Sequence, residues 1–159
     1  MQKEIKMYLS DVRIKNFRCF DETEHIVRFH SGLNVLVGEN DSGKSAIIDS
    51  IRIVLGTTDQ GWYKIEPTDF YNEDRAREIS IICHFKDLNE NECAAFLECL
   101  TYEDDGSGNK PNLYLHWSCK YLQNFTPARA AASVYTNLSG DGPSPAIEAR
   151  ELLRVTYLR

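Results

Sequence analysis

One run of residues limits the possible folds of this chain more than any other feature, namely Gly38-Glu39-Asn40-Asp41-Ser42-Gly43-Lys44-Ser45. It fits the pattern GxxxxGK(S/T), in which small residues let backbone N–H groups point into one concave nest that accepts phosphate oxygens. In this pattern Lys44 reaches the β and γ phosphates, and Ser45 supplies a hydroxyl ligand to Mg²⁺. The sequence therefore predicts ATP and Mg²⁺ as cofactors, bound by Gly38, Asn40, Asp41, Ser42, Gly43, Lys44 and Ser45.

The segments on either side give this loop the surroundings that a phosphate loop requires. Before it, residues 33–37 form a nearly continuous apolar run, which predicts a central strand covered on both faces. After it, apolar residues recur every three or four positions over 44–55, and Gly56 follows as a natural helix stop. This order predicts an α/β fold of the P-loop NTPase class, with a mixed β-sheet and flanking helices. An ordinary glycine turn is the disfavoured alternative.

The remaining sequence predicts further strands and two short helices. Alternating apolar residues indicate strands over 7–16, 24–29, 79–85, 113–121 and 154–159. Asn89, with Glu92 three residues later, predicts a capped amphipathic helix at the periphery. Residues 144–145 can open a final helix, and the turn formers of 103–112 predict an exposed hairpin loop. The mixed pattern of 123–143 predicts no particular structure.

Composition excludes several classes of protein. The chain has 159 residues, 42% of them hydrophobic and 26% charged, which suits one globular domain. No apolar stretch reaches the ~20 residues that span a bilayer, and the N-terminus lacks the apolar part of a secretory signal. A cytoplasmic location without membrane contact is therefore expected. The five cysteines include no CxxC pair, which favours reduced, mostly buried thiols over disulfides or zinc.

Charge is unevenly distributed along this chain of net charge -6. Residues 59–105 are strongly acidic, whereas the first twenty residues carry more cations than carboxylates. The cations of this N-terminal segment are Lys3, Lys6, Arg13, Lys15 and Arg18. Duplex DNA is expected to contact this segment or regions beyond residue 159, and not the acidic stretch. The alternative is that these cations only solubilise an edge strand.

Phosphate binding alone does not give hydrolysis. Hydrolysis also needs a carboxylate at the end of a second buried strand and a group that positions water. Asp87 follows Lys86 and fits the first role poorly. Residues 138–142 resemble the LSGG signature of ATP-binding-cassette proteins, but their composition favours a simple turn. The catalytic residues therefore stay unassigned, and this segment alone is expected neither to hydrolyse ATP nor to cut DNA.

Two segments, residues 12–20 and 32–45, resemble the opening of SMC and RecF type ATPases. Within that group the chain most resembles the overcoming-lysogenization-defect (OLD) nucleases. This resemblance depends on the Gly-Glu-Asn-Asp form of the loop, on residues 46–52, on Thr68-Asp69-Phe70-Tyr71 and on residues 152–159. It implies that residues 1–159 are the N-terminal part of an ABC/SMC-type ATPase lobe, with Arg18 near the nucleotide. The Walker B carboxylate, the signature and the nuclease would lie outside this segment.

The resemblance also implies a function for the intact protein. OLD proteins join such an ATPase, interrupted by a dimerisation insert, to a C-terminal Toprim domain that cuts DNA with divalent metal. Many of them act in defence against phage. The implied partners are DNA and further copies of the chain, as a homodimer or higher oligomer, with an accessory defence protein or RNA as a further candidate. The alternatives are a RecF or SMC type repair ATPase without a nuclease, and a module in which nucleotide only sets the oligomeric state.

Overall fold

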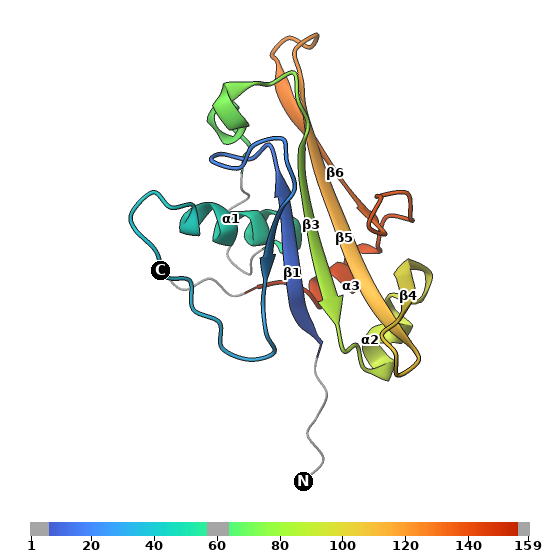
Figure 1. Ribbon diagram of the computed structural model, residues 1–159. Coiled ribbons are helices and arrows are strands. Elements are labelled where there is room, and N and C mark those ends of the chain that lie inside the picture. The colour runs from blue at the N-terminus through green and yellow to red at the C-terminus, as the bar shows by residue number, and fades with distance from the viewer. Residues whose placement is uncertain (1–6, 57–63, 156–159) are drawn as a thin grey trace.

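A twisted sheet with helices packed against it forms the body of the protein (Figure 1). The computed structural model describes residues 7–56 and 64–155. The strands are β1 (Tyr8–Lys15), β2 (His25–Arg28), β3 (Ile79–Lys86), β4 (Leu100–Asp104), β5 (Asn109–Leu122) and β6 (Arg129–Thr136). The α-helices are α1 (Lys44–Leu55), α2 (Glu90–Ala95) and α3 (Ile147–Glu151), and the 3-10 turns are η1 (Pro67–Asp69), η2 (Tyr71–Glu73) and η3 (Leu97–Cys99). This arrangement of sheet and flanking helices confirms the predicted fold class.

The strands follow the order β2-β1-β3-β5-β4, and β6 also pairs with β5. The pairings among these strands are antiparallel. The strands predicted over 7–16, 24–29, 79–85 and 113–121 are confirmed. The hairpin predicted over 103–112 is present, but β4 and β5 extend into this range and leave only residues 105–108 as the turn. The strand β6 had no prediction, because the alanines of its sequence RAAASVYT give little strand signal. The strand β6 therefore forms because it pairs with β5 and not because of its own residue preferences.

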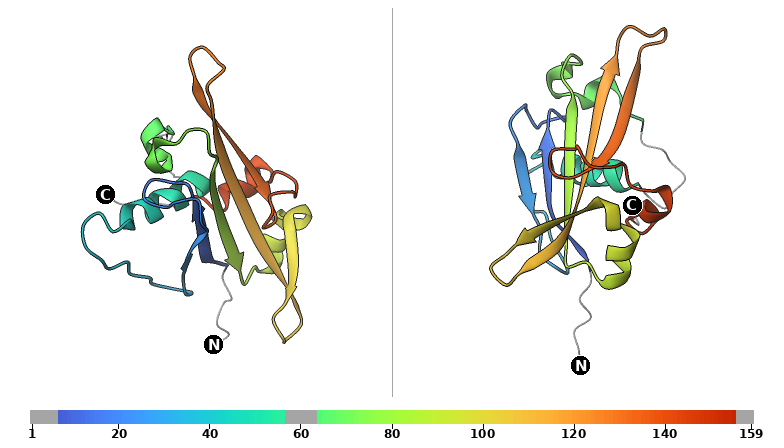
Figure 2. Two further views of the ribbon diagram at one scale, coloured as in Figure 1. Left: turned by 45° about the horizontal axis from the view of Figure 1, so that its top comes forward. Right: turned by 90° about the vertical axis from the view of Figure 1, so that its right-hand side faces the viewer.

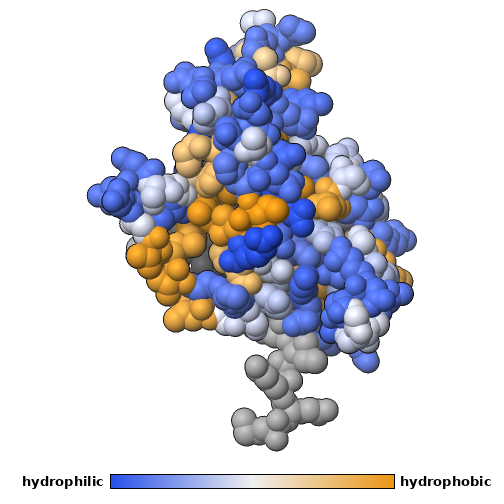
Figure 3. Space-filling view, viewed as in Figure 1, coloured by the Kyte–Doolittle hydropathy of each residue, from blue (hydrophilic) through white to orange (hydrophobic). Residues whose placement is uncertain are grey.

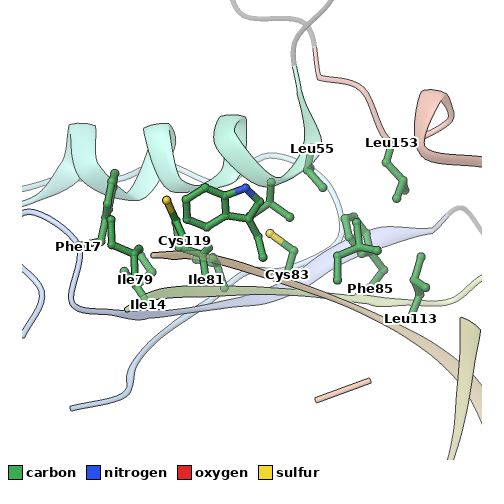
Figure 4. Packing of buried hydrophobic residues seen from close by; sticks show 14 of the residues in the cluster. Ile14, Phe17, Leu55, Ile79, Ile81, Cys83, Phe85, Leu113, Cys119 and Leu153 are labelled. Atoms are coloured by element: carbon green, nitrogen blue, oxygen red, sulfur yellow. The ribbon is translucent and has the colours of Figure 1, made fainter. Parts of the chain in front are cut away.

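The hydrophobic core lies between α1 and one face of the sheet (Figure 4). The side chains of Ile81, Cys83 and Phe85 alternate along β3 and are buried against this layer. Phe17, fully buried, closes the same layer next to α1. The helix α1 thus begins at the glycine loop and is held in place by the core beneath it.

Local signals predicted the helices well. The helix over 44–55 is confirmed, and it ends at Gly56, whose N–H bonds to the Arg52 carbonyl. The capping box is confirmed as well, since Asn89 and Glu92 each accept from the other's backbone N–H. The helix that residues 144–145 were expected to open appears as α3.

The central strand predicted over 33–37 is wrong. This run is not a strand, and the side chains of Leu33, Val35 and Val37 are 93%, 72% and 89% exposed. The amide of Asn34 accepts from the His30 N–H and donates to the His30 carbonyl, so local bonds replace a ladder. Figure 3 shows apolar surface on this side of the molecule. The apolar composition of this segment is typical of a buried strand, but no described residues pack over its side chains.

Two further features complete the fold. The strand predicted over 154–159 falls mostly outside the described residues, which reach only Val155. Three of the five free cysteines are buried, and burial raises the pKa of the Cys119 thiol to about 11. The burial of these three thiols agrees with the prediction that the cysteines are mostly buried. Within the described ranges, no helix is long and apolar enough to cross a membrane.

A buried polar network crosses the face of the sheet opposite the core. His84 Nδ1 lies 2.8 Å from the Asp11 carboxylate, and His84 Nε2 lies 2.8 Å from the Asn112 side-chain oxygen. The Asn112 amide nitrogen donates to the Lys110 carbonyl, which turns its oxygen toward the ring. Both ring nitrogens thus lie within hydrogen-bond distance of side-chain oxygens. The network links β1, β3 and β5 through buried polar side chains.

Candidate nucleotide site

The glycine loop ends where α1 begins, at Lys44. The Lys44 ammonium donates to the Gly38 carbonyl at 2.8 Å, to the Ser42 hydroxyl at 3.2 Å and to the Glu39 carbonyl. The Lys44 side chain therefore folds back over the loop. A bound phosphate would compete with these loop oxygens for the Lys44 ammonium. A hollow of about 820 Å³ adjoins Lys44 and Ser45.

Both glycines of the loop lie close to other side chains. A Cβ on Gly38 would lie 2.7 Å from the Ser42 hydroxyl. Gly43 has φ +89°, and a Cβ there would lie 3.0 Å from Cys19 Sγ. This close approach places the turn that carries Arg18 directly against the phosphate loop. The left-handed backbone at Gly43 requires glycine, whereas a side chain at Gly38 would require the Ser42 hydroxyl to turn away.

We expect Gly43→Ala to weaken nucleotide binding at least tenfold, because the new methyl group would push the Cys19 turn away from the loop. The left-handed backbone should also cost about 1–2 kcal/mol of unfolding free energy. Gly106→Ala is the matched control, since Gly106 has φ +87° and open space around it. Urea denaturation should show a similar backbone cost in both variants, and calorimetry should show lost binding only in Gly43→Ala. Equal nucleotide affinity in the two variants would contradict the close packing at Gly43.

The N-terminus of α1 is suited to an anion. Its N-cap, Gly43, makes no side-chain capping bond, and no acidic side chain lies in the first turn. The first N–H groups of a helix have no partner within the helix, and the helix dipole places positive charge there. Asp41 (φ +62°) and Gly43 both have left-handed backbones, which turns successive N–H groups toward one point. A phosphate would satisfy donors that the described side chains do not.

Arg18 lies between two carboxylates. Its Nη1 donates to Asp49 at 2.6 Å, and its Nε donates to Asp69 at 3.0 Å. Asp49 also accepts from Arg52, and the second oxygen of Asp69 accepts from the Glu66 N–H. Arg18 is thus fixed close to the first turns of α1, where the resemblance had placed it near the nucleotide. Its role toward the nucleotide stays a prediction.

The turn that carries Arg18 is itself constrained. Asn16 and Arg18 have φ +56° and +50°, which non-glycine residues seldom adopt. Backbone bonds hold the turn in place, from Arg18 N–H to the Asp69 carbonyl and from Tyr71 N–H to the Asn16 carbonyl. Strained residues of this kind persist only where the surrounding structure determines them. The turn is therefore held between η1 and the phosphate loop.

No role for Asp49 or Asp69 followed from the sequence alone. A signal for Asp49 was present, since it lies one helical turn after Ser45 and so shares its face of α1. Asp69 appeared only as part of a family resemblance, because nothing local links it to Arg18, 51 residues away. Both carboxylates belong to the site through tertiary contacts.

The cations proposed as a DNA surface are mostly neutralised. Arg13 pairs with Asp11 and Glu24, and Lys15 pairs with Glu24. Lys3 and Lys6 lie outside the described residues. Residues 138–142 form a turn in which the Gly140 N–H bonds to the Asn137 carbonyl, as their composition favoured. The N-terminal segment therefore offers little unpaired charge within the part that the structure describes.

A sheet flanked by helices and a glycine loop leading into an uncapped helix define a P-loop nucleotide-binding lobe of the ATPase class. Residues 7–131 match the family AAA_15, described as an AAA ATPase domain. The chain belongs to this family.

Several curated proteins are similar over shorter stretches. The OLD nuclease of Thermus scotoductus is 35% identical over 81 residues, 48% of this chain and 14% of that protein. The DNA double-strand break repair Rad50 ATPase of Pyrococcus abyssi is 43% identical over 49 residues, 31% of this chain and 5% of that protein. The DNA replication and repair protein RecF of Streptococcus gordonii is 42% identical over 45 residues, 28% of this chain and 12% of that protein. The chain thus spans a small part of each relative.

The fold itself has a solved counterpart. A structure titled "Structural biochemistry of ATP-driven dimerization and DNA stimulated activation of SMC ATPases" aligns with a TM-score of 0.54 at 18% identity. The alignment covers 92% of this chain and 76% of that chain. This likeness confirms the SMC-type ATPase fold, and at this identity it shows the fold alone.

Proposed function

We propose that this chain is the ATP-binding lobe of an OLD-type DNA endonuclease, in which ATP controls cleavage by a C-terminal Toprim domain. The observation that carries the nucleotide part is the uncapped, acid-free N-terminus of α1 behind the glycine loop. The nuclease part is supported by the similarity to the OLD nuclease, which extends over 81 residues. The similarities to Rad50 and RecF extend over 49 and 45 residues.

In this proposal each residue of the loop has a distinct task. The backbone N–H groups of 40–45 bind phosphate oxygens, and Lys44 leaves its loop carbonyls to neutralise the β and γ phosphates. The Ser45 hydroxyl, exposed in the first turn of α1, is a hard oxygen donor suited to Mg²⁺. Mg²⁺ would add positive charge beside the phosphates. Arg18, held by Asp49 and Asp69, would lie beside the same phosphates.

The proposal assigns further parts of the protein to regions outside residues 1–159. These are the dimerisation insert, the Toprim domain and the acidic strand that completes the metal site. A strand from such a region would also cover the exposed run at residues 33–37. DNA as substrate, a homodimer or higher oligomer, a cytoplasmic location and a role against phage belong to the same proposal, as does an accessory protein or RNA.

The test is DNA cleavage and ATP turnover by the full-length protein. We expect divalent metal to support cleavage, ATP to change its rate severalfold, and Lys44→Ala to abolish turnover together with the ATP effect. Plasmid nicking and phosphate release measure the two activities separately. ATP turnover without cleavage in any metal would reject the nuclease assignment and favour a RecF or SMC type repair ATPase. If the wild-type protein cleaves DNA at the same rate with and without ATP, the proposed control by ATP is rejected.

A repair ATPase without a nuclease is the second candidate. It is supported by the similarities to Rad50, RecF and a chromosome partition protein Smc of Clostridium kluyveri, which is 47% identical over 53 residues. Each of these similarities covers only a small part of a much longer protein. A non-hydrolysing module that sets oligomeric state would bind ATP without turnover, so phosphate release separates it from both other candidates.

A further inference from the structure

The hairpin formed by β5 and β6 projects beyond the rest of the sheet (Figures 1 and 2). Pairing between β3 and β5 ends at Ile79 and Cys119, whereas pairing between β5 and β6 continues to Leu122 and Arg129. The chain past Cys119 is therefore a two-stranded ribbon with the exposed loop 123–128 at its tip. Alanines at 130–132 keep this ribbon slim.

The ribbon is electropositive in a protein of net charge -6. No Asp or Glu occurs between Asp105 and Asp141, a span that contains Lys110, Lys120 and Arg129. Arg75, from the turn after η2, reaches the same place, because its guanidinium lies over the Tyr121 ring. The tip thus brings together cations from two distant segments.

Two of these cations keep their full charge. The guanidinium carbon of Arg75 is 5.3 Å from the centroid of Tyr121, and that of Arg129 is 5.1 Å from the centroid of Phe125. Within the described part of the chain, neither guanidinium has an ion-pair partner. Stacking on an aromatic ring orients a guanidinium without neutralising it, so its N–H groups can still bind an anion. Phe125 itself is 50% exposed.

Neighbouring cations differ in this respect. Arg77 pairs with Glu22 at 2.9 Å and Asp74 at 3.0 Å, and Lys120 lies 3.5 Å from Glu78. The arginines and lysine of β1 and the following turn are likewise paired with carboxylates. The uncompensated charge of the described surface near the ribbon therefore belongs to Arg75 and Arg129.

We infer that the tip of the β5–β6 ribbon, with Arg75 beside it, is a contact surface for the phosphate backbone of duplex DNA. The inference rests on the proposed function for DNA as the substrate, and it adds the surface. The major groove admits a two-stranded β-ribbon, and stacked guanidiniums at the tip would meet phosphates at its edges. Each neutralised phosphate releases counterions, which favours binding at low salt.

This surface differs from the one expected from charge along the sequence. That expectation placed DNA on the N-terminal segment or beyond residue 159 and excluded residues 59–105, within which Arg75 lies. A stretch that is acidic on average can still present one unpaired cation, and a basic segment can be neutralised by its neighbours. Pairing in three dimensions decides which charges a ligand meets.

The test is DNA binding by the full-length protein carrying Arg75→Gln and Arg129→Gln, measured by fluorescence anisotropy with a short mixed-sequence duplex over a range of salt. We expect weaker binding and a salt dependence, log K against log salt, that is shallower by about 2, since each lost phosphate contact removes about 0.9. Lys110→Gln with Arg154→Gln is the matched control, because it removes the same charge at sites paired with Asp105 and Glu151. Arg75→Lys with Arg129→Lys should keep most of the slope.

The outcomes separate this surface from the proposed function. A wild-type salt slope in the Arg75 and Arg129 double variant, with DNA binding intact, would overturn the surface and leave the nuclease proposal standing. Absence of duplex binding by the wild-type protein would overturn both the surface and the DNA part of the function. Binding of polyglutamate in place of DNA, lost in the same double variant, would make the ribbon a site for acidic protein segments and reject the assignment to DNA. ATP affinity should be unchanged in every variant.

Discussion

Replacing Lys44 with alanine is expected to lower the affinity for ATP by roughly thirtyfold or more, about 2 kcal/mol. The estimate follows from the loss of charge-assisted hydrogen bonds to phosphate oxygens, each worth ≈ 1.5–3 kcal/mol, less the loop bonds that Lys44 gives up on binding. Those loop bonds, to the Gly38 and Glu39 carbonyls and the Ser42 hydroxyl, exist without nucleotide and offset part of the gain. Isothermal calorimetry on the full-length protein measures the difference.

A matched control distinguishes the site from general charge. Lys86→Ala removes a lysine from the end of β3 and should leave ATP affinity unchanged. Ser45→Ala should weaken binding more in the presence of Mg²⁺ than in its absence, because only the metal needs that hydroxyl. If Lys44→Ala binds ATP as tightly as the wild type does, the phosphate-loop assignment is incorrect.

The second large effect concerns stability. Asp11→Ala is expected to lower the free energy of unfolding by about 2 kcal/mol, since it leaves a buried ring nitrogen of His84 without its hydrogen-bond partner. The side chains of His84 and Asp11 are only 4% and 11% exposed, and the ring of His84 also stacks on Tyr114 at 4.0 Å. Urea denaturation measures the loss, and Asp104→Ala, at the exposed end of β4, is the control. A double variant with His84→Leu should recover part of the loss, because no buried ring nitrogen then remains without a partner.

The same carboxylate predicts a pH dependence. Burial would raise the pKa of Asp11, but hydrogen bonds from His84 and Arg13 and their positive charges hold this pKa below its ordinary value of 3.8. A carboxyl whose pKa is lowered on folding stabilises the protein at pH above the unfolded pKa, and this stability is lost as the pH falls through the folded pKa. Wild-type stability should therefore fall more steeply with acid below about pH 4 than that of Asp11→Asn. Parallel acid profiles would show that Asp11 is not the group responsible.

Local physics made much of this fold predictable. The helix α1 follows from apolar residues at helical spacing and a glycine stop, and α2 follows from the reciprocal bonds of Asn89 and Glu92. These signals act within a few residues, so no distant partner is needed to interpret them. The glycine loop is also a local signal, because the left-handed backbone at Gly43 requires glycine independently of distant residues.

The parts that could not be predicted depend on distant residues. Arg18 is oriented by Asp49 and Asp69, which lie 31 and 51 residues away in the sequence. The alanine-rich β6 becomes a strand because β5 supplies its ladder, including a contact of 3.3 Å between the Ser118 and Ser133 hydroxyls. For residues 33–37 the sequence predicted a strand that the structure lacks. Their apolar composition is typical of a strand covered on both faces, and the described residues do not provide that cover.

That uncovered run has a consequence for how the protein is made and handled. Leu33, Val35 and Val37 present apolar side chains to water, and Ile48 on α1 is also 38% exposed. During synthesis this apolar stretch emerges early and stays exposed until another strand packs over it. Exposed apolar segments of this kind promote aggregation and bind chaperones. A short, uncharged, β-branched segment is also a template for pairing between chains. Residues 1–159 produced by themselves are expected to aggregate with rising concentration, and Val35→Lys should keep them dispersed.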